Sequence, residues 1–380
     1  MKRIAFVTNF CPFYRIKLFE TLSDSYEMMF LFYSEGKEWY WQKSHGVQNG
    51  NFNSKYLPGF WVGKTRVTIT LLLELLRGRY DVFIKCINGK FALPSTYILA
   101  KILGKPFILY TGIWMRLESV LHKVIFPLTR YIYRNADAIV VYGQHIKTYL
   151  ISEGVQAEII FVAPHAVDNA AYQIPQNFAK QKLLKEQLEI PERKKIILYL
   201  GRLEAMKGVD TLIKAFALLN RDDTILIIAG DGTLAESLLE LTSELEIQQS
   251  VRFPGYIERE NTIDYYDLAD IFVLPSVTVP TGKEPWGLTI NEVFNRGIPV
   301  VTSNVVGAAA GGLVEDQING LIFEENNISA FADALNELLE NENKRKSFGK
   351  NASKKINSWD IGKMAEGFVE AIEYVTRRNS

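Results

Sequence analysis

The feature that most limits how this chain can fold is an end-to-end alternation of short β-branched runs with longer helical stretches. In the first half the strand-like runs are RIAFVT, MMFLFY, DVFIKC, PFILYT, DAIVVY and EIIFVA, and helical patterns such as VTITLLLELLRG and PSTYILAKILG lie between them. Strands separated by crossover helices pair in parallel and carry helices on both faces of the sheet. This half therefore predicts a doubly wound α/β domain.

The second half repeats the order with KIILYLG, TILIIAG, SVRFPG, DIFVLP, IPVVTS and GLIF. A chain of 380 residues is too long for one ordinary core and fits two domains. The polar segment 168–193 has no strand-like run, which indicates a linker and a short helix. We expect domains over 1–175 and 176–358, then an amphipathic helix over 359–380.

The amino-acid composition indicates in which cellular compartment the protein works. Only two cysteines occur, Cys11 and Cys86, so a reducing compartment is expected rather than a disulfide framework. The apolar run at the N-terminus ends after about five residues, short of a secretory signal. No stretch approaches the roughly 20 apolar residues of a membrane span. These features predict a cytoplasmic protein.

Charge is distributed unequally between the two halves. Residues 1–190 hold 23 Lys and Arg against 14 Asp and Glu, a net +9, and the remainder holds 43 − 23 = 20 against 43 − 14 = 29, a net −9. A basic half favours an anionic partner. Its cations are dispersed, so nucleic acid is not expected. The segment 116–134 mixes cations with apolar residues as an interfacial helix does, or as a packed helix with solvated cations does. We predict peripheral attachment to an anionic membrane surface.

Ligands of open α/β sheets bind outside the carboxyl ends of the strands, so loops that follow strands are the places to search. The loop GRLEAMKG, 201–208, follows the run IILYL. Gly201 permits a tight turn, and Arg202 and Lys207 place two cations where a diphosphate could be neutralised. A surface turn with two solvated cations is the alternative.

The next loop, AGDGTL, 229–234, resembles a phosphate-binding turn, although glycines are common where a strand meets a helix. We expect Asp231 or Thr233 to cap the helix that follows. The acidic Asp231 argues against direct contact with phosphate.

A third loop, SVTVPTGKEPW, 276–286, leads into a helix expected to begin near Gly287. The free N–H groups of that helix would form an anion site. Glu284 in the loop and Glu292 on the first turns can each accept hydrogen bonds from a pair of sugar hydroxyls. Alternatively, Glu292 only stabilises the helix through its favourable interaction with the helix dipole, and Glu284 is a solvated charge of the loop. Their combination with the two cations of the first loop favours a binding site.

These motifs together resemble a known family. GRLEAMKG, AGDGTL, FPGYI, the two glutamates eight positions apart and the downstream GAAAGGLVEDQINGLIF are similar to those of the retaining glycosyltransferases of family four. The resemblance implies the GT-B fold, with two Rossmann-like doubly wound parallel-sheet domains facing across a deep cleft. It also implies that the last helix crosses back to the N-terminal domain.

The resemblance implies a nucleotide-diphosphate sugar, with UDP or GDP, held by the C-terminal domain. Arg202 and Lys207 would contact the diphosphate, Glu292 the ribose and Glu284 the donor sugar. Arg202, Lys207 and Glu284 are the catalytic candidates. The remaining donor-binding candidates are Gly201, Tyr256, Ile257, Trp286, Gly287 and Leu288.

The first half matches the family less well. Family members often carry a His after the strand that here ends in ILYT, and this chain has Thr111 and Trp114 in that stretch instead. His165, where the chain leaves the last strand of this half, is a cleft candidate, and a structural or solvated histidine is the alternative. Arg15, after the first strand, is a candidate for an acceptor phosphate.

The family also implies a mechanism. Front-face attack is expected, in which the leaving diphosphate helps to deprotonate the acceptor and Arg202 and Lys207 stabilise it. We expect no cofactor and no metal ion, because two cations and a helix N-terminus replace Mg²⁺. The acceptor would be a glycan or a lipid-linked molecule in surface polysaccharide or glycoconjugate assembly.

Other classes of function remain open. A dinucleotide oxidoreductase would need G-x-G-x-x-G after its first strand, which neither VTNFCPF nor YLGRLEAM supplies. A sugar-nucleotide epimerase of the same fold, or a catalytically silent protein that binds sugar nucleotides, would share most of these residues.

Overall fold

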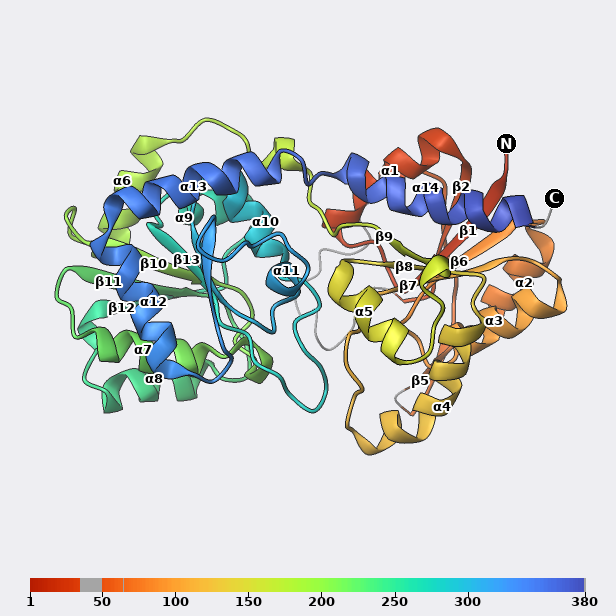
Figure 1. The fold of residues 1–380 in the computed structure, drawn as a ribbon, viewed down its shortest axis with the longest axis horizontal. Coiled ribbons are helices and arrows are strands. Elements are labelled where there is room, and N and C mark those ends of the chain that lie inside the picture. Colours follow the sequence, from red (N-terminus) through yellow and green to blue (C-terminus); the bar gives the residue numbers. More distant parts are fainter. Residues whose placement is uncertain (35–49, 64, 379–380) are drawn as a thin grey trace. The chain divides into compact units, whose positions relative to one another are not determined.

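The computed structural model describes residues 1–34, 50–63 and 65–378, and it divides the chain into two compact units (Figure 1). Unit 1 comprises Met1–Trp114, Ser119–Asp168 and Asp360–Ser380, and unit 2 comprises Met115–Glu118 and Asn169–Trp359. The division thus falls after residue 168, earlier than the expected residue 175. The reason is that Asn169 and Gln173 bond to unit 2. The Asn169 amide donates to the carbonyl of Ile356 at 3.0 Å, and the Gln173 amide donates to Asn357 at 2.9 Å.

Unit 1 contains a seven-stranded parallel sheet in the order β3-β2-β1-β6-β7-β8-β9. A two-stranded antiparallel hairpin accompanies it, and neither this hairpin nor β3 was expected from the sequence. The strands are β1 (Arg3–Thr8), β2 (Glu27–Phe32), β3 (Ser54–Tyr56), β4 (Phe60–Val62), β5 (Thr65–Val67), β6 (Val82–Cys86), β7 (Phe107–Thr111), β8 (Ala138–Val141) and β9 (Ile160–Val162).

Helices cover both faces of this sheet. One face shares a buried core with α2 (Ile69–Arg77), α3 (Ala92–Ile102), α4 (Val120–Asn135) and α5 (Gln144–Ser152). The other face carries α1 (Ile16–Ser25) and the C-terminal helix α14 (Ile361–Arg378), which pack on each other (Figure 1). Phe368 of α14 lies between Phe6 and Tyr110, with ring centroids at 5.9 and 4.8 Å. The C-terminal helix is therefore part of the core of unit 1.

Unit 2 contains a six-stranded parallel sheet in the order β12-β11-β10-β13-β14-β15. Helices α7, α8 and α12 lie on one face, and α6, α9, α10 and α13 lie on the other (Figure 1). The strands are β10 (Lys195–Leu200), β11 (Thr224–Ala229), β12 (Val251–Gly255), β13 (Ile271–Leu274), β14 (Val300–Ser303) and β15 (Gly320–Phe323). The helices are α6 (Phe178–Gln187), α7 (Val209–Leu219), α8 (Ala235–Glu244), α9 (Thr262–Tyr266), α10 (Leu288–Asn295), α11 (Gly307–Ala310), α12 (Ile328–Glu340) and α13 (Glu342–Ile356).

The expected fold class is confirmed, because each strand-like run of the sequence forms a strand and both sheets are parallel and doubly wound. Strands buried on both faces read as continuous apolar runs, which is why the sequence signal was strong. Among the described residues, no helix combines the length and the apolar character needed to cross a membrane.

Loops that follow the strands of unit 2 approach one another at glycines. Gly208, between the loop after β10 and α7, has a φ of 63°, and a Cβ atom there would lie 2.2 Å from the carbonyl oxygen of Pro275. The amide of Val277 donates to the carbonyl of Met206 at 2.8 Å. The loop after β10 is therefore pressed against the end of β13.

Unit 1 buries a lysine at the carboxyl end of β6. Lys85 is fully buried, and its ammonium donates to the backbone carbonyls of Cys86 at 2.6 Å and Asn88 at 2.7 Å. Burial, with a smaller contribution from the charge of Arg15, lowers the pKa of Lys85 to about 7. The unfolded chain therefore binds more protons than the folded chain between about pH 7 and the ordinary lysine pKa of about 10.4.

Stability should accordingly rise with pH in that window. We expect the free energy of unfolding of the wild type to gain about 2 kcal/mol between about pH 7 and pH 9 relative to Lys85→Met. Denaturant unfolding of both proteins at the two pH values measures this difference. An identical pH dependence of wild type and variant would show that the buried lysine does not titrate in this range.

Gly208→Ala should destabilise unit 2 more than a matched control does. Gly312 also has a positive φ, 85°, but a Cβ atom there meets nothing within 4 Å. An L-residue in this conformation costs about 1 kcal/mol at either site, and only Gly208→Ala adds a backbone clash. We expect Gly208→Ala to cost at least about 2 kcal/mol more than Gly312→Ala in denaturant unfolding. Equal losses would mean that the loop can move away from β13.

Candidate functional site

Two of the three predicted catalytic residues of unit 2 meet at an ion pair. Lys207 ends the 3-10 turn Ala205–Lys207 after β10, and its ammonium bonds to the carboxylate of Glu284. Both side chains are largely buried, with 13% and 10% of their surface exposed. The hydroxyl of Ser276 donates to the same carboxylate at 3.4 Å. A buried ion pair of this kind fixes two loops relative to each other, because separating the charges would leave each without a partner.

Glu284 is held by its backbone as well as by its side chain. Its segment forms a parallel bridge with Val306, and its carbonyl accepts from the amide of Gly307 at 3.1 Å. Counted over backbone and side chain together, Glu284 is 7% exposed. The alternative of a solvated loop charge is therefore wrong for this residue.

Arg202 lies in the same loop as Lys207 and is exposed. The hydroxyl of the buried Tyr199 donates to the backbone carbonyl of Arg202 at 2.6 Å and so anchors the turn. Gly201 is partly buried, and its amide donates to the carbonyl of Ala229 at 3.0 Å, next to the adjacent strand. The loop thus carries an exposed arginine and a largely buried lysine on a fixed backbone, which suits an anionic ligand.

Helix α10 begins as expected from the sequence. Gly287 is its N-cap with a φ of 92°, no side chain caps the helix there, and Leu288, its first residue, is partly buried. Trp286 is buried, and its indole N–H donates to Asn291 at 2.8 Å while its ring stacks on Trp359 at 5.7 Å. Trp286 therefore contributes packing, and the backbone around it is what remains for ligand contact.

Glu292 projects from α10 into a group of tyrosines. The hydroxyl of Tyr266 donates to its carboxylate, and Tyr172 also hydrogen bonds to it. Burial raises the pKa of Glu292, and the two phenols and the nearby Arg259 act in the opposite direction. Sequence reasoning missed both tyrosines, because neither lies in a motif near Glu292.

The loop after β11 differs from the expectation. Helix α8 has Leu234 at its N-cap, without a side-chain cap. The carboxylate of Asp231 accepts from the adjacent Gly232 amide at 2.8 Å, and Thr233 donates to Glu204 at 2.9 Å. The predicted capping of α8 by Asp231 or Thr233 is wrong, because both side chains are used inside the loops. At the end of β12, Tyr256 is exposed and Ile257 is partly buried.

In unit 1, Arg15 and His165 meet at Tyr142. The guanidinium of Arg15 donates to the Tyr142 hydroxyl at 3.3 Å, and the His165 ring stacks on the Tyr142 ring at 4.3 Å. Arg15 is 8% and His165 is 4% exposed. Burial, followed by the charge of Arg15, lowers the pKa of His165 to about 3. His165 is therefore neutral at physiological pH.

The other two candidates of unit 1 lie after β7. Thr111 is buried, and its hydroxyl accepts from the amide of Ile113 at 3.2 Å. Trp114 is partly buried against the core and makes an edge contact with His145 at 4.8 Å. The structure thus gives Thr111 a local structural bond and Trp114 a packing contact.

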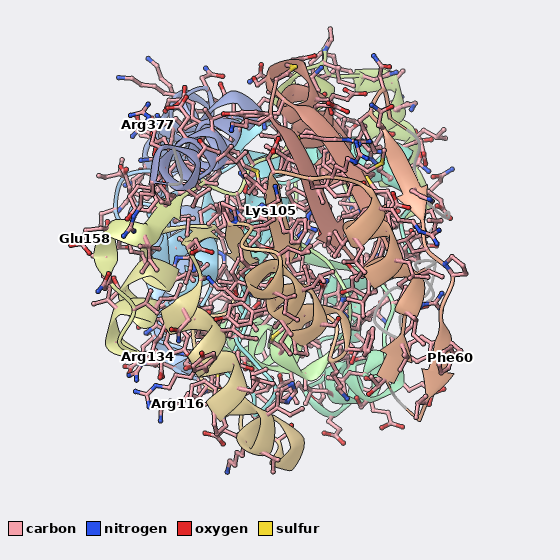
Figure 2. All side chains as sticks on the ribbon, turned by 90° about the vertical axis from the view of Figure 1, so that its right-hand side faces the viewer. Phe60, Lys105, Arg116, Arg134, Glu158 and Arg377 are labelled. Carbon is pink, nitrogen blue, oxygen red and sulfur yellow. The ribbon has the colours of Figure 1, made fainter. Side chains whose placement is uncertain are left out.

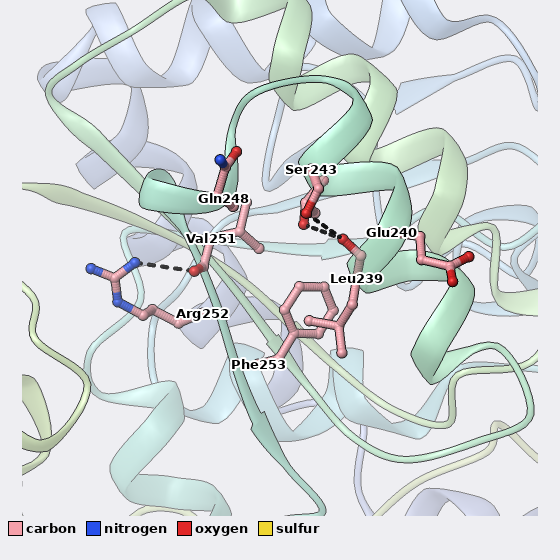
Figure 3. A pocket seen from close by; sticks show the side chains of 8 residues that line it. Leu239, Glu240, Ser243, Gln248, Val251, Arg252 and Phe253 are labelled. Carbon is pink, nitrogen blue, oxygen red and sulfur yellow. Dashed lines mark hydrogen bonds between the residues drawn. The ribbon is translucent and has the colours of Figure 1, made fainter.

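A hollow of about 420 Å³ lies between α8 and β12, and its lining includes none of the predicted site residues (Figure 3). Arg252 lines it, and its guanidinium donates to backbone carbonyls, among them Leu188 at 2.6 Å and Glu189 at 3.0 Å. These bonds occupy the guanidinium of Arg252, and the other charged residue that lines the hollow is Glu240. Within the described part of the chain, no group of three or more His, Cys, Asp or Glu side chains could hold a metal ion.

Comparison with known proteins shows which proteins this chain is similar to. Residues 180–355 match the family model of glycosyl transferases group 1. A D-inositol 3-phosphate glycosyltransferase of Corynebacterium aurimucosum is 33% identical over 57% of this chain and 52% of its own length. An alpha-monoglucosyldiacylglycerol synthase of Streptococcus pneumoniae is 30% identical over 52% of this chain and 43% of its own length. The chain spans about half the length of the curated relatives it matches.

Solved structures extend the likeness to the whole fold. Anabaena HepE in complex with UDP superimposes with a TM-score of 0.77, at 18% identity, over 98% of this chain and 100% of that one. Identity at this level establishes architecture only. Residues 180–355, which form most of unit 2, thus match the glycosyl transferases group 1 family model, and the two parallel-sheet units give the chain a GT-B fold.

Proposed function

We propose that this protein transfers a sugar from a nucleotide-diphosphate sugar to a glycan or lipid-linked acceptor. The observation that carries the proposal is the junction of Lys207 and Glu284 beside the exposed Arg202, at the carboxyl ends of β10 and β13. Ligands of parallel sheets bind at that edge. The family match of this unit supports the same conclusion.

The two cations would act on the diphosphate. Arg202 and Lys207 would neutralise the charge that develops on the leaving group, which is where a preorganised cation lowers the barrier. Lys207 is shared with Glu284, so the diphosphate competes with that carboxylate for the ammonium. Glu284, once relieved of part of this bond, is placed to accept from hydroxyls of the donor sugar.

We propose a retaining reaction on one face of the sugar. The bond between the anomeric carbon and the diphosphate oxygen breaks, and the acceptor oxygen forms the new bond from the same side. The acceptor proton passes to an oxygen of the departing diphosphate, so no external base is consumed. Since Arg202, Lys207 and the N-terminus of α10 supply the positive charge, the reaction is proposed to need no metal ion.

The partners are proposed by analogy and by position. UDP is bound by the similar Anabaena structure, and the names of the two relatives describe an inositol phosphate and a glycolipid product. We therefore propose a UDP- or GDP-sugar donor, with Tyr256 and Ile257 against the base, in glycoconjugate or surface polysaccharide assembly. Unit 1 would take the acceptor at the carboxyl edge of its sheet, where Arg15, Thr111, Trp114 and His165 lie.

We also propose that unit 1 attaches peripherally to an anionic membrane surface inside the cell. Helices α3 and α4 lie side by side, joined by a Tyr97–Tyr131 ring contact at 6.2 Å, and Lys101 of α3 pairs at 2.9 Å with Asp137, which follows α4 (Figure 2). Their outer surface exposes apolar side chains beside cations, a combination that favours anionic lipid. The apolar residues are Ile98, Ile102, Leu103, Val124, Leu128 and Tyr131, and the exposed cations are Lys101, Lys123 and Arg134.

Nucleotide binding tests the proposed donor site. With EDTA present, the thermal unfolding temperature should rise by a few degrees in saturating UDP or GDP and stay unchanged in NADH, because a ligand at about a hundred times its Kd stabilises by roughly 2.7 kcal/mol. Lys207→Met should lose most of the shift. Lys214→Met is the matched control, since Lys214 pairs with Asp210 on the surface of α7. A shift in NADH alone, or none in any nucleoside diphosphate, would contradict the proposal.

Vesicle sedimentation tests the membrane surface. The protein should pellet with vesicles containing phosphatidylglycerol at low salt, and raised salt should weaken binding because charge attraction is screened. Ile102→Ser with Val124→Ser should reduce the pelleted fraction several-fold. Leu218→Ser with Leu239→Ser, which removes comparably exposed residues from unit 2, should leave it unchanged. Equal binding by both double variants, or none by the wild type, would exclude this surface.

A further inference from the structure

The carboxylate of Glu292 is held by two phenols that come from distant parts of unit 2. Tyr266, the last residue of α9, donates its hydroxyl to Glu292 and is completely buried. Tyr172, just after the turn Asn169–Ala171, is 5% exposed and also hydrogen bonds to Glu292. Two hydroxyl donors on one buried carboxylate restrict its rotation and leave its remaining lone pairs in fixed directions.

One arginine fixes both tyrosines relative to the helix that carries Glu292. Arg296 follows the last residue of α10 and forms a bidentate pair with Asp267, at 2.7 and 2.9 Å, next to Tyr266 in the chain. The same guanidinium donates to the backbone carbonyl of Tyr172 at 2.5 Å. The pair is almost fully buried, with 4% and 3% of the side chains exposed. A buried bidentate pair is geometrically specific, so the phenols and the carboxylate form one rigid group.

This group matters because the family resemblance implies that Glu292 holds the ribose of the donor. A carboxylate binds two neighbouring hydroxyls well only when it is ionised and turned so that both acceptors face them. Burial alone favours the neutral acid, whereas phenol donors favour the ionised form. The phenols therefore act against the protonation that burial would cause.

We propose that Tyr266 and Tyr172 are positioning residues that orient Glu292 toward the 2′- and 3′-hydroxyls of the donor ribose, and so set the preference for ribonucleotides over deoxyribonucleotides. The proposal rests on the proposed function of unit 2 as the nucleotide-sugar site. It adds two residues that need not touch the donor themselves.

The test compares ligands that differ by one hydroxyl. Dissociation constants of UDP and 2′-deoxy-UDP, or of the corresponding GDP pair if GDP binds, are measured by calorimetry for five proteins. These are the wild type, Glu292→Gln, Tyr266→Phe, Tyr172→Phe and the control Tyr265→Phe. Tyr265 is the neighbour of Tyr266 on α9 and is 8% exposed. Burial is the cause that raises the pKa of its hydroxyl.

We expect the wild type to prefer the ribonucleotide by about tenfold or more, the value of one hydrogen bond to a charged group. Glu292→Gln should abolish most of that ratio, Tyr266→Phe and Tyr172→Phe should reduce it several-fold, and Tyr265→Phe should keep it. The ratio separates positioning from general loss of stability, because a weakened fold lowers affinity for both ligands alike.

The outcomes distinguish the positioning role of the two tyrosines from the proposed donor site itself. If both tyrosine variants keep the wild-type ratio while Glu292→Gln loses it, the positioning role is wrong and the donor site stands. If Glu292→Gln keeps the ratio, the ribose contact is wrong and the positioning role falls with it. If no protein binds either nucleotide, the proposed function itself is overturned.

Discussion

Lys207 and Glu284 come from the loops that follow two neighbouring strands, β10 and β13, and their largely buried ion pair holds those loops together. Neither charge can be buried at low cost without the other. The same contact brings the exposed Arg202 loop and the N-terminus of α10 to one edge of the sheet. The proposed donor site is the chemical consequence of this junction, since an anionic diphosphate is the type of ligand that can share Lys207 with a carboxylate.

Around this pair, backbone approach and buried polar groups fix the remaining parts. Gly208 lets the first loop lie against the carbonyl of Pro275, and the bridge from Glu284 to Val306 extends the contact to the segment before α11. The Arg296–Asp267 pair fixes the part of unit 2 in which Glu292 contacts its two tyrosines. The proposed donor site therefore combines a charged junction, proposed for phosphates, with a rigid carboxylate, proposed for hydroxyls, and each rests on parallel-sheet architecture.

Much of the fold could be predicted because its signals are local. Continuous apolar runs marked the strands, and Gly287 marked the start of α10 to within a residue. The short strands β3, β4 and β5 were missed because their three-residue runs carry little periodic signal. The division was expected at residue 175 instead of 168, because side-chain bonds of Asn169 and Gln173, rather than composition, assign that segment to unit 2.

The site could be predicted only as far as its motifs extend. Arg202, Lys207 and Glu284 stood out through loop position, but the pairing of Lys207 with Glu284 joins residues 77 positions apart and leaves no local pattern. Tyr172 lies even farther along the chain from Glu292. The capping of α8 was mispredicted because Asp231 and Thr233 find partners within the loops. Long-range side-chain bonds are the part of a site that sequence motifs do not encode.

The most direct measurement is a crystal structure of the chain with UDP, and in parallel with GDP. The account predicts a diphosphate bonded to Lys207 and Arg202 at the N-terminal end of α10, and a ribose whose hydroxyls donate to Glu292. A nucleotide bound elsewhere, for example in the hollow between α8 and β12, with the Lys207–Glu284 pair undisturbed, would contradict it.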